Sequence, residues 1–181
     1  MPMTTTHALV PLAAALALTK RPVPWKLVAA AAFAAAAPDI DGLSKHFLHM
    51  PPWSMYSHRG ATHSLFVALA AGLVAALFHR RLDVRPLTAG IVIAAATASH
   101  GLLDMMTDRG MPVAYLWPLS SVRLFADWRP IRSEPVHLAH LFSSALARFQ
   151  SELLQLIIPM FVIALAVRAC REGVTRLQSQ R

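Results

Sequence analysis

The sequence predicts an all-α protein embedded in a membrane. Apolar residues make up 56% of the 181 residues and charged residues 14%, whereas ordinary soluble domains carry about 45–50% and roughly 25%. The apolar residues gather in five stretches rich in alanine and leucine, which favour helix over strand. We therefore expect an integral membrane bundle of about five apolar helices, forming a single domain over residues 1–181. The alternative is a soluble all-α domain with unusually apolar helices.

The five stretches differ in length. They run over residues 5–18, 25–37, 62–78, 87–103 and 153–169. The last three are long enough to cross a bilayer, which takes about 17–25 apolar residues. The first two are shorter, and they could be short spans, a re-entrant hairpin or buried core helices. Pro11 and Pro159 lie inside the first and last stretches and predict kinks there.

A long polar connection precedes the last stretch. Residues 105–150 are rich in proline, which is typical of a structured loop lying at the membrane interface. Within this connection, residues 137–150 could form an amphipathic helix on the membrane surface. We expect the last helix to cover residues 151–171. The motifs described below all lie within residues 1–125.

The charges are unevenly distributed. The chain has 17 Lys and Arg against 9 Asp and Glu, a formal net charge of +8, which can indicate a nucleic-acid binder. If all five stretches cross, residues 19–26, residues 79–86 and the C-terminal tail share one side, with ten basic and two acidic residues. The other side then carries seven of each. Because Lys and Arg favour cytoplasmic loops, we expect the C-terminus inside, the N-terminus outside, and no direct nucleic-acid binding.

Histidine and aspartate gather on the near-neutral side, at the expected ends of the helices. The residues are His7, Asp39, Asp41, His58, Arg59, His63, His100, Asp104 and Thr107. In the five-crossing arrangement they all lie at one membrane face. Histidine and aspartate are the usual nitrogen and oxygen ligands of zinc, and aspartate also suits manganese and magnesium. The pattern therefore predicts an interfacial divalent-metal site.

Local spacing supports this interpretation. His100 and Asp104 are four residues apart and share one side of a helix, and Asp39 and Asp41 share a side if their segment is extended. Arg59 is suited to bidentate phosphate or carboxylate binding. A structural hydrogen bond could equally explain the first pair, and a turn or cap the second. We expect the other histidines of this side to be surface or interfacial residues: His46, His49, His137 and His140.

The motifs resemble those of a known family. They are Thr6-His7, PDID at 38–41, HRGATHS at 58–64, HGLLDMMT at 100–107, Gly110, Trp117-Pro118 and Arg123. In this order they resemble the YdjM-type family over residues 1–125. Its members are described as metal-dependent hydrolases of the bacterial inner membrane, and some are called LexA-binding. The family is distantly similar to the zinc-dependent phospholipase C and P1-nuclease group, which is helical and hydrolyses phosphoesters.

The resemblance implies roles for particular residues. The implied metal ligands are His7, Asp39, His63, His100 and Asp104, and the implied cofactor is one or more divalent ions of the zinc type. His58 and Asp41 are the next candidates after these ligands, and Asp41 would act as a general base. Arg59 and Arg123 would hold a phosphate-like anion, and Thr107 would join them in binding substrate. Arg59 would also stabilise developing negative charge.

The expected function is metal-assisted hydrolysis in a multi-pass inner-membrane protein. A site at the membrane face favours a lipid-linked or amphiphilic phosphoester as the substrate. One alternative is a non-catalytic membrane protein that binds a regulatory partner or transports a divalent metal. A transporter would place His and Asp near mid-bilayer, whereas here they lie at the ends of the stretches. Another alternative is a soluble or peripheral zinc enzyme.

Overall fold

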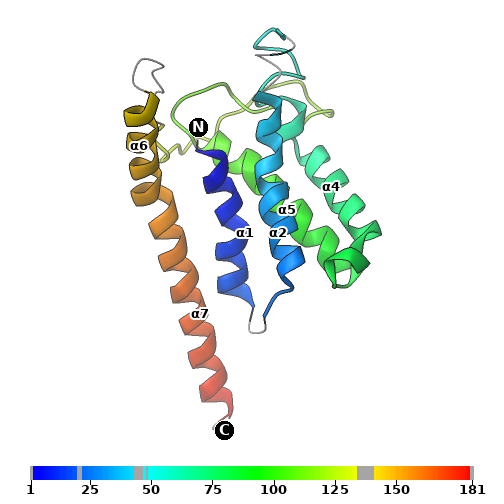
Figure 1. Cartoon of the computed structure of the whole chain (residues 1–181), viewed down its shortest axis with the longest axis vertical. Coiled ribbons are helices and arrows are strands. Elements are labelled where there is room, and N and C mark those ends of the chain that lie inside the picture. The colour runs from blue at the N-terminus through cyan, green and yellow to red at the C-terminus, as the bar shows by residue number, and fades with distance from the viewer. Residues whose placement is uncertain (1, 20–21, 43–46, 48, 134–140, 180–181) are drawn as a thin grey trace.

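The principal helices of the chain run alternately up and down. The computed structural model describes residues 2–19, 22–42, 47, 49–133 and 141–179. Its long helices are α1 (Thr4–Leu18), α2 (Trp25–Ala36), α4 (Leu65–Leu77), α5 (Pro86–Met105) and α7 (Ile158–Ser179). As Figure 1 shows, the start of α1, the end of α2 and the end of α5 lie at one end of the bundle, hereafter the site end. The described residues contain helices and no extended strand, so the all-α prediction is confirmed.

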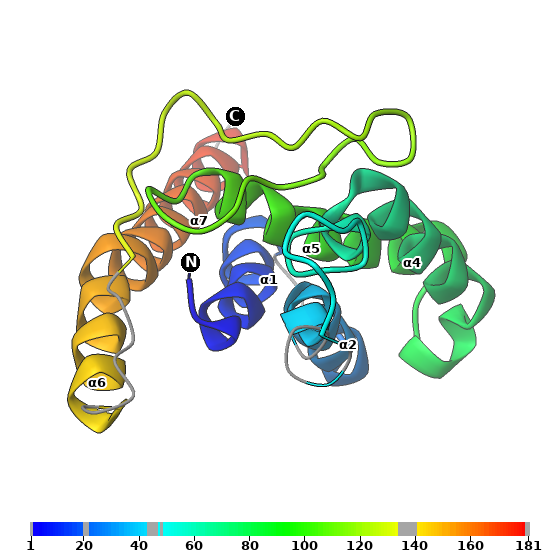
Figure 2. The same ribbon diagram turned by 90° about the horizontal axis from the view of Figure 1, so that it is seen from above.

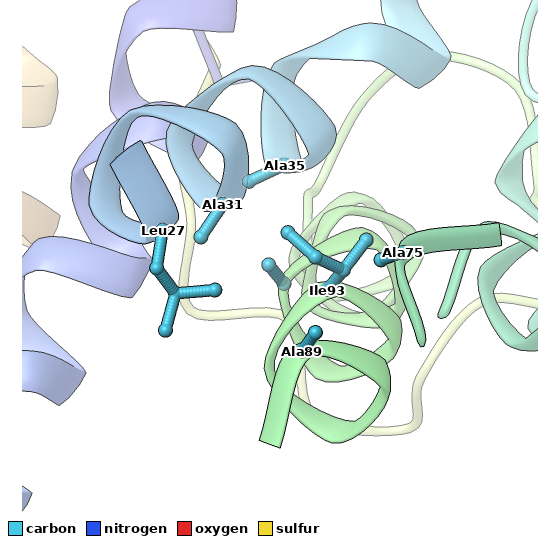
Figure 3. Close-up of a cluster of buried hydrophobic side chains, with 7 residues drawn as sticks. Leu27, Ala31, Ala35, Ala75, Ala89 and Ile93 are labelled. Atoms are coloured by element: carbon cyan, nitrogen blue, oxygen red, sulfur yellow. The ribbon is translucent and has the colours of Figure 1, made fainter. Parts of the chain in front are cut away.

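Five of the seven residues of the buried apolar cluster are alanines. The buried apolar cluster between α2, α4 and α5 consists of Leu27, Ala31, Ala35, Ala75, Ala89, Ile93 and Ala96 (Figure 3). Small side chains let helix backbones approach closely, which is how helices pack in lipid. The three helices therefore form a compact unit that holds the ends of α2 and α5 side by side.

The bundle has an apolar exterior, and its interior is polar at the site end. On α4, Leu69, Leu73 and Leu77 are 58–73% exposed, while His100 and Asp104 of α5 are fully buried. Large exposed apolar surfaces are rare on soluble monomers and mark contact with a membrane or another protein. This distribution agrees with the predicted membrane embedding.

Only part of the predicted spanning pattern is present. Two helices of the described chain are long and apolar enough to cross a membrane, Pro86–Met105 and Phe142–Thr175. The third stretch, predicted to span from residue 62, forms a helix of only 13 residues. It starts late because a short 3₁₀ turn, η2 (Ala61–His63), precedes it and the Ser64 hydroxyl caps its first turn through the Val67 N–H.

The C-terminal part forms one long helical rod. We predicted a separate surface helix over residues 137–150, but α6 (Leu141–Glu152) continues through a wide π turn, η5 (Leu153–Ile157), into α7. Residues 134–140 lie outside the described residues. The π turn stands just before Pro159, which has no N–H to donate and would clash with the carbonyl four residues earlier in a regular helix. Pro11 also lies within a helix, and α1 continues past it.

The segment from 106 to 133 folds over the site end (Figure 2). It is tied down by main-chain hydrogen bonds, from the Ala114 N–H to the Arg59 carbonyl at 3.0 Å and from the Leu65 N–H to the Tyr115 carbonyl at 2.9 Å. Val113 and Ala114, which belong to this segment, are fully buried. The predicted loop is therefore structured, and main-chain hydrogen bonds attach it to the segment that carries the polar residues. At the opposite end, the short turn η3 (His79–Leu82) joins α4 to α5.

Candidate metal centre

Four helix ends bring the predicted ligands together. His7 lies in the first turn of α1, Asp39 in the 3₁₀ helix η1 (Ala37–Gly42), His63 in η2, and His100 and Asp104 in the last turns of α5. Helix α2 passes at Ala37 into the 3₁₀ helix η1, which contains Pro38, and Asp39 Oδ1 lies 3.3 Å from His100 Nε2 of α5. Residues 97 positions apart in sequence thus meet at the site end.

Four ligand atoms converge on one point. The Nε2 atoms of His63 and His100 lie 3.0 Å apart. His100 Nε2 is 3.3 Å from Asp39 Oδ1, and His63 Nε2 is 3.4 Å from Asp104 Oδ2. One ligand atom from each of these four residues lies within 4.8 Å of every other. Two imidazoles and two carboxylates at such distances have the donor set of a divalent-metal site.

The opposite ring nitrogens fix which atoms face this point. His100 Nδ1 lies 2.7 Å from the Ala35 carbonyl oxygen, which can only accept, so Nδ1 carries the proton. His63 Nδ1 lies 3.1 Å from Asp41 Oδ2 and likewise donates. In the neutral rings both Nε2 atoms then present lone pairs to each other. Metal-bound histidines are oriented in this way by carbonyl and carboxylate partners.

Unpartnered acceptors complete the argument for a cation. Asp39 Oδ1 and both carboxylate oxygens of Asp104 are buried and make no hydrogen bond of good geometry within the described residues, and only Asp104 Oδ2 has a cation beside it, Arg59 Nε at 2.9 Å. Buried acceptors without partners are costly, and a cation among them would remove the cost. The residues present therefore fit a divalent metal.

The pKa shifts at the site also favour positive charge between the carboxylates. Burial alone would lower the pKa of His63, but the Asp104 and Asp41 carboxylates, 3.4 and 3.1 Å from its ring nitrogens, raise that pKa to about 9. Burial would raise the pKa of Asp41, but hydrogen bonds from His58 and His63 hold it well below its usual range. The acids are thus ionised, and together they favour positive charge at the ring between them.

Asp39 is held from its other side. Its Oδ2 accepts a 2.6 Å hydrogen bond from the Thr4 hydroxyl of α1. Burial would raise the pKa of Asp39, but the His100 ring, 3.3 Å from Oδ1, and the hydrogen bond from Thr4 lower it. This leaves Oδ1 directed at the cluster.

His7 lies beside the four converging residues. Its ring is fully buried and stacks on His100 with ring centroids 3.7 Å apart. Its Nε2 is 3.7 Å from Asp104 Oδ1, and neither ring nitrogen makes a hydrogen bond within the described residues. His7 is outside the group of four mutually close ligand atoms, so its place as a ligand stays a prediction.

Asp41 supports the histidines on both sides of it. Its Oδ1 lies 2.7 Å from His58 Nδ1, and its Oδ2 accepts from Thr62 and His63. The predicted role of a free general base is therefore not favoured, because both oxygens are occupied. The His58 side chain is 25% exposed, so the Asp41–His58 pair links the buried cluster to the surface.

Arg59 and Thr107 are placed differently from what the sequence suggested. The Arg59 side chain is fully buried, with Nε 2.9 Å from Asp104 Oδ2. Its Nη1 donates to the Met111 carbonyl at 2.7 Å and its Nη2 to the Thr107 hydroxyl at 3.0 Å. These contacts leave Arg59 as the counter-charge of Asp104, and they do not favour the predicted contact of either residue with a substrate anion.

Arg123 also binds the protein itself. Its Nη2 donates to the Ser54 carbonyl at 2.7 Å, and its Nη1 to the carbonyls of His58 and Arg59 at 3.3 and 3.2 Å. This guanidinium therefore holds the loop that carries the HRGATHS motif, and the geometry does not favour the predicted phosphate contact. Of the other histidines, His49 is exposed as expected, while His46, His137 and His140 lie outside the described residues.

The sequence analysis assigned no role to two residues of the site, Gly101 and Glu152. A Cβ on Gly101 would lie 2.5 Å from the His63 carbonyl oxygen, so only glycine lets η2 pack against α5 here. Its position directly after His100 was the available signal. Glu152 lies at the start of α1, although 149 residues separate it from Met3; no local motif indicates that contact.

The fold and the site together define a helical membrane protein with a buried His/Asp centre at one end. Comparison places it more closely: the chain belongs to the YdjM inner membrane protein family, whose model matches residues 1–173. It is 36% identical to the inner membrane protein YbcI of Escherichia coli (strain K12) over 140 residues, 77% of this chain and 80% of that protein. No solved structure matches the chain.

These matches confirm the family resemblance and support an inner-membrane location. They extend the similarity beyond the predicted limit at residue 125. The likeness to phospholipase C and the hydrolase activity stay predictions.

Proposed function

We propose that this protein is a metal-dependent hydrolase of the inner membrane, acting on a phosphoester of a lipid-linked or amphiphilic substrate. The observation that carries the proposal is the convergence of Asp39, His63, His100 and Asp104, whose ligand atoms lie within 4.8 Å of one another. Family membership and the apolar exterior support the membrane setting.

The four residues would hold the ion, with His7 beside them as a further ligand. Two imidazoles and two carboxylates suit zinc, and also manganese. A divalent ion held there would supply a polarising charge and would lower the pKa of bound water to about 7.

The remaining polar residues would keep this set in place. Arg59 balances the buried charge of Asp104, and Asp41 orients His63 through Nδ1. His58 is oriented by the same carboxylate and is partly exposed, so it is placed to carry a proton between the site and water. Such His–carboxylate pairs serve proton transfer in many enzymes.

An apolar cavity supports a substrate with a hydrocarbon part. It has a volume of about 310 Å³ and lies between α1, α2 and α5, within the usual size range of ligand sites. Two of its lining residues lie close to the site in sequence: Val10 is one helical turn from His7, and Ser99 directly precedes His100. An alkyl chain in this cavity would bring an attached headgroup to the site end.

We propose that all five helical segments insert in the bilayer, with α1, α2 and α4 as short segments of 15, 12 and 13 residues. The alternating directions of the helices and the exposed leucines of α4 support this arrangement. The basic ends of the helices, opposite the site, would face the cytoplasm. The site would then face outward.

The test is hydrolysis by the detergent-purified full chain. The probes are a chromogenic phosphodiester and phosphatidylglycerol vesicles, and the matched variants are His63→Ala and Asp83→Asn, the latter in an exposed ion pair with Lys26. We expect turnover by wild type and Asp83→Asn that a chelator or His63→Ala abolishes. A wild type that binds metal but hydrolyses neither probe would favour the non-catalytic alternative. Transport is already disfavoured, because the ligands lie at helix ends.

A further inference from the structure

Helix α1, which carries His7, begins without a cap of its own. Its N-cap residue is Met3, whose side chain makes no capping hydrogen bond, and its first turn contains no acidic residue. The first N–H groups of a helix need partners, and its positive end favours a negative charge. A partner from elsewhere in the chain can satisfy this need.

Glu152, the last residue of α6, supplies that partner. Its Oε1 and Oε2 accept from the Met3 N–H at 2.9 and 2.8 Å, and Oε2 accepts from the Thr6 hydroxyl at 2.5 Å. Glu152 is only 3% exposed and Thr6 only 2%. An acid so deeply buried, whose hydrogen bonds within the described residues go to one helix start, is a cap contributed by another helix.

The same rod also binds the other end of α1. Arg171 of α7 donates from Nη1 to the Ala17 carbonyl at 2.9 Å, where the negative end of the α1 dipole favours a cation. The rod therefore places an acid at the start and a base at the end of α1. These two contacts hold α1 against the rod at both of its ends.

We propose that Glu152 is a positioning residue of the metal centre, which acts by holding the first turn of α1 so that His7 faces Asp104. His7 directly follows Thr6, and its own ring nitrogens make no hydrogen bond within the described residues. Its orientation therefore depends on the stacking with His100 and on the placement of α1. This inference rests on the proposed metal centre.

The test measures Co²⁺ affinity and the visible spectrum of bound Co²⁺ in the detergent-purified full chain. The variants are Glu152→Ala, His7→Ala and the double variant, with Glu172→Gln as the control. Glu172 is an exposed acid on the same rod, paired with Arg168. We expect Glu152→Ala to weaken Co²⁺ binding about 10-fold, as loss of an outer partner of a metal ligand does, and to change the spectrum. In the His7→Ala background, Glu152→Ala should cause no further loss.

The outcomes separate the two proposals. Equal affinities of wild type and Glu152→Ala, or the same loss with and without His7, would overturn the positioning role alone. A wild type that binds no Co²⁺ would overturn the metal centre and this inference with it. If Glu152→Ala does not fold, Glu152→Gln retains an acceptor oxygen without the charge, and it should show a smaller loss that again disappears without His7; no loss in this variant would count against the proposal.

Discussion

The Nε2 atoms of His63 and His100 face each other at 3.0 Å, although 37 positions separate the two residues in sequence. Each ring is turned toward the other by a partner on its far side, Asp41 for His63 and the Ala35 carbonyl for His100. Two imidazoles oriented in this way cannot both present lone pairs without a cation or a proton between them. This pair is the centre of the proposed metal site.

Asp41→Asn should weaken metal binding without abolishing it. The asparagine keeps the shape but loses the charge that orients His63 through its Nδ1–H, and loss of such a partner typically costs 10–100-fold in affinity (about 1–3 kcal/mol). Asp104→Asn, at a converging ligand, should abolish binding. Co²⁺ titration measures both. The exposed Asp83→Asn is the control, and an Asp41→Asn protein with wild-type affinity would remove Asp41 from this role.

Arg59→Met should destabilise the protein. The substitution leaves the Asp104 carboxylate buried without its counter-charge, a change that costs about 3–5 kcal/mol in comparable buried pairs. We expect a lowered apparent melting temperature in detergent, partly restored by added Zn²⁺, because the cation replaces the lost positive charge. Arg109→Met, at a side chain 64% exposed, should melt like wild type. If Arg59→Met melts normally and loses only turnover, the earlier expectation of an anion-binding arginine would be favoured instead.

Gly101→Ala should separate η2 from α5. Its Cβ would lie 2.5 Å from the His63 carbonyl oxygen, and overpacking of this kind costs about 1–3 kcal/mol. We expect a lower melting temperature together with weaker Co²⁺ binding, because His63 is displaced. Gly173→Ala has open space around the new methyl group, and it should be neutral or stabilising by about 0.5–1 kcal/mol. Similar behaviour of the two variants would argue against the close packing.

The orientation in the membrane can be tested at both ends. A reporter fused after Arg181 should be active only in its cytoplasmic form. A cysteine at the exposed Ser121, in a Cys170→Ala background, should react with a membrane-impermeant thiol reagent from outside intact spheroplasts. The reason is the surplus of Lys and Arg in the short segments opposite the site. An extracytoplasmic reporter signal would reverse the proposed topology.

The fold was predictable where local chemistry decides it. Runs of alanine and leucine between prolines predicted the helices, and the position of Pro38 predicted the end of α2. Two boundaries were wrong because they depend on details that composition does not show. Ser64 caps α4 and delays its start, and the rod continues from α6 to α7 through a π turn before Pro159.

The sequence predicted which residues form the site better than it predicted the role of each residue. Histidine and aspartate are conspicuous in an apolar chain, so Asp39, His63 and His100 could be named from sequence. The role of Arg59 could not, because its burial results from the 106–133 segment folding over it. The contact of Glu152 with α1 could not be predicted either, because the two segments are far apart in sequence.

The most direct test of the central claim is elemental analysis of the detergent-purified full chain prepared in chelator-free buffer, beside His63→Ala and Asp83→Asn. We expect wild type and Asp83→Asn to carry a stoichiometric amount of zinc or another divalent metal, and His63→Ala to carry none while retaining its helical content and its place in the membrane. A folded wild type that is free of metal, and that takes up none when Zn²⁺ or Mn²⁺ is added, would contradict the claim.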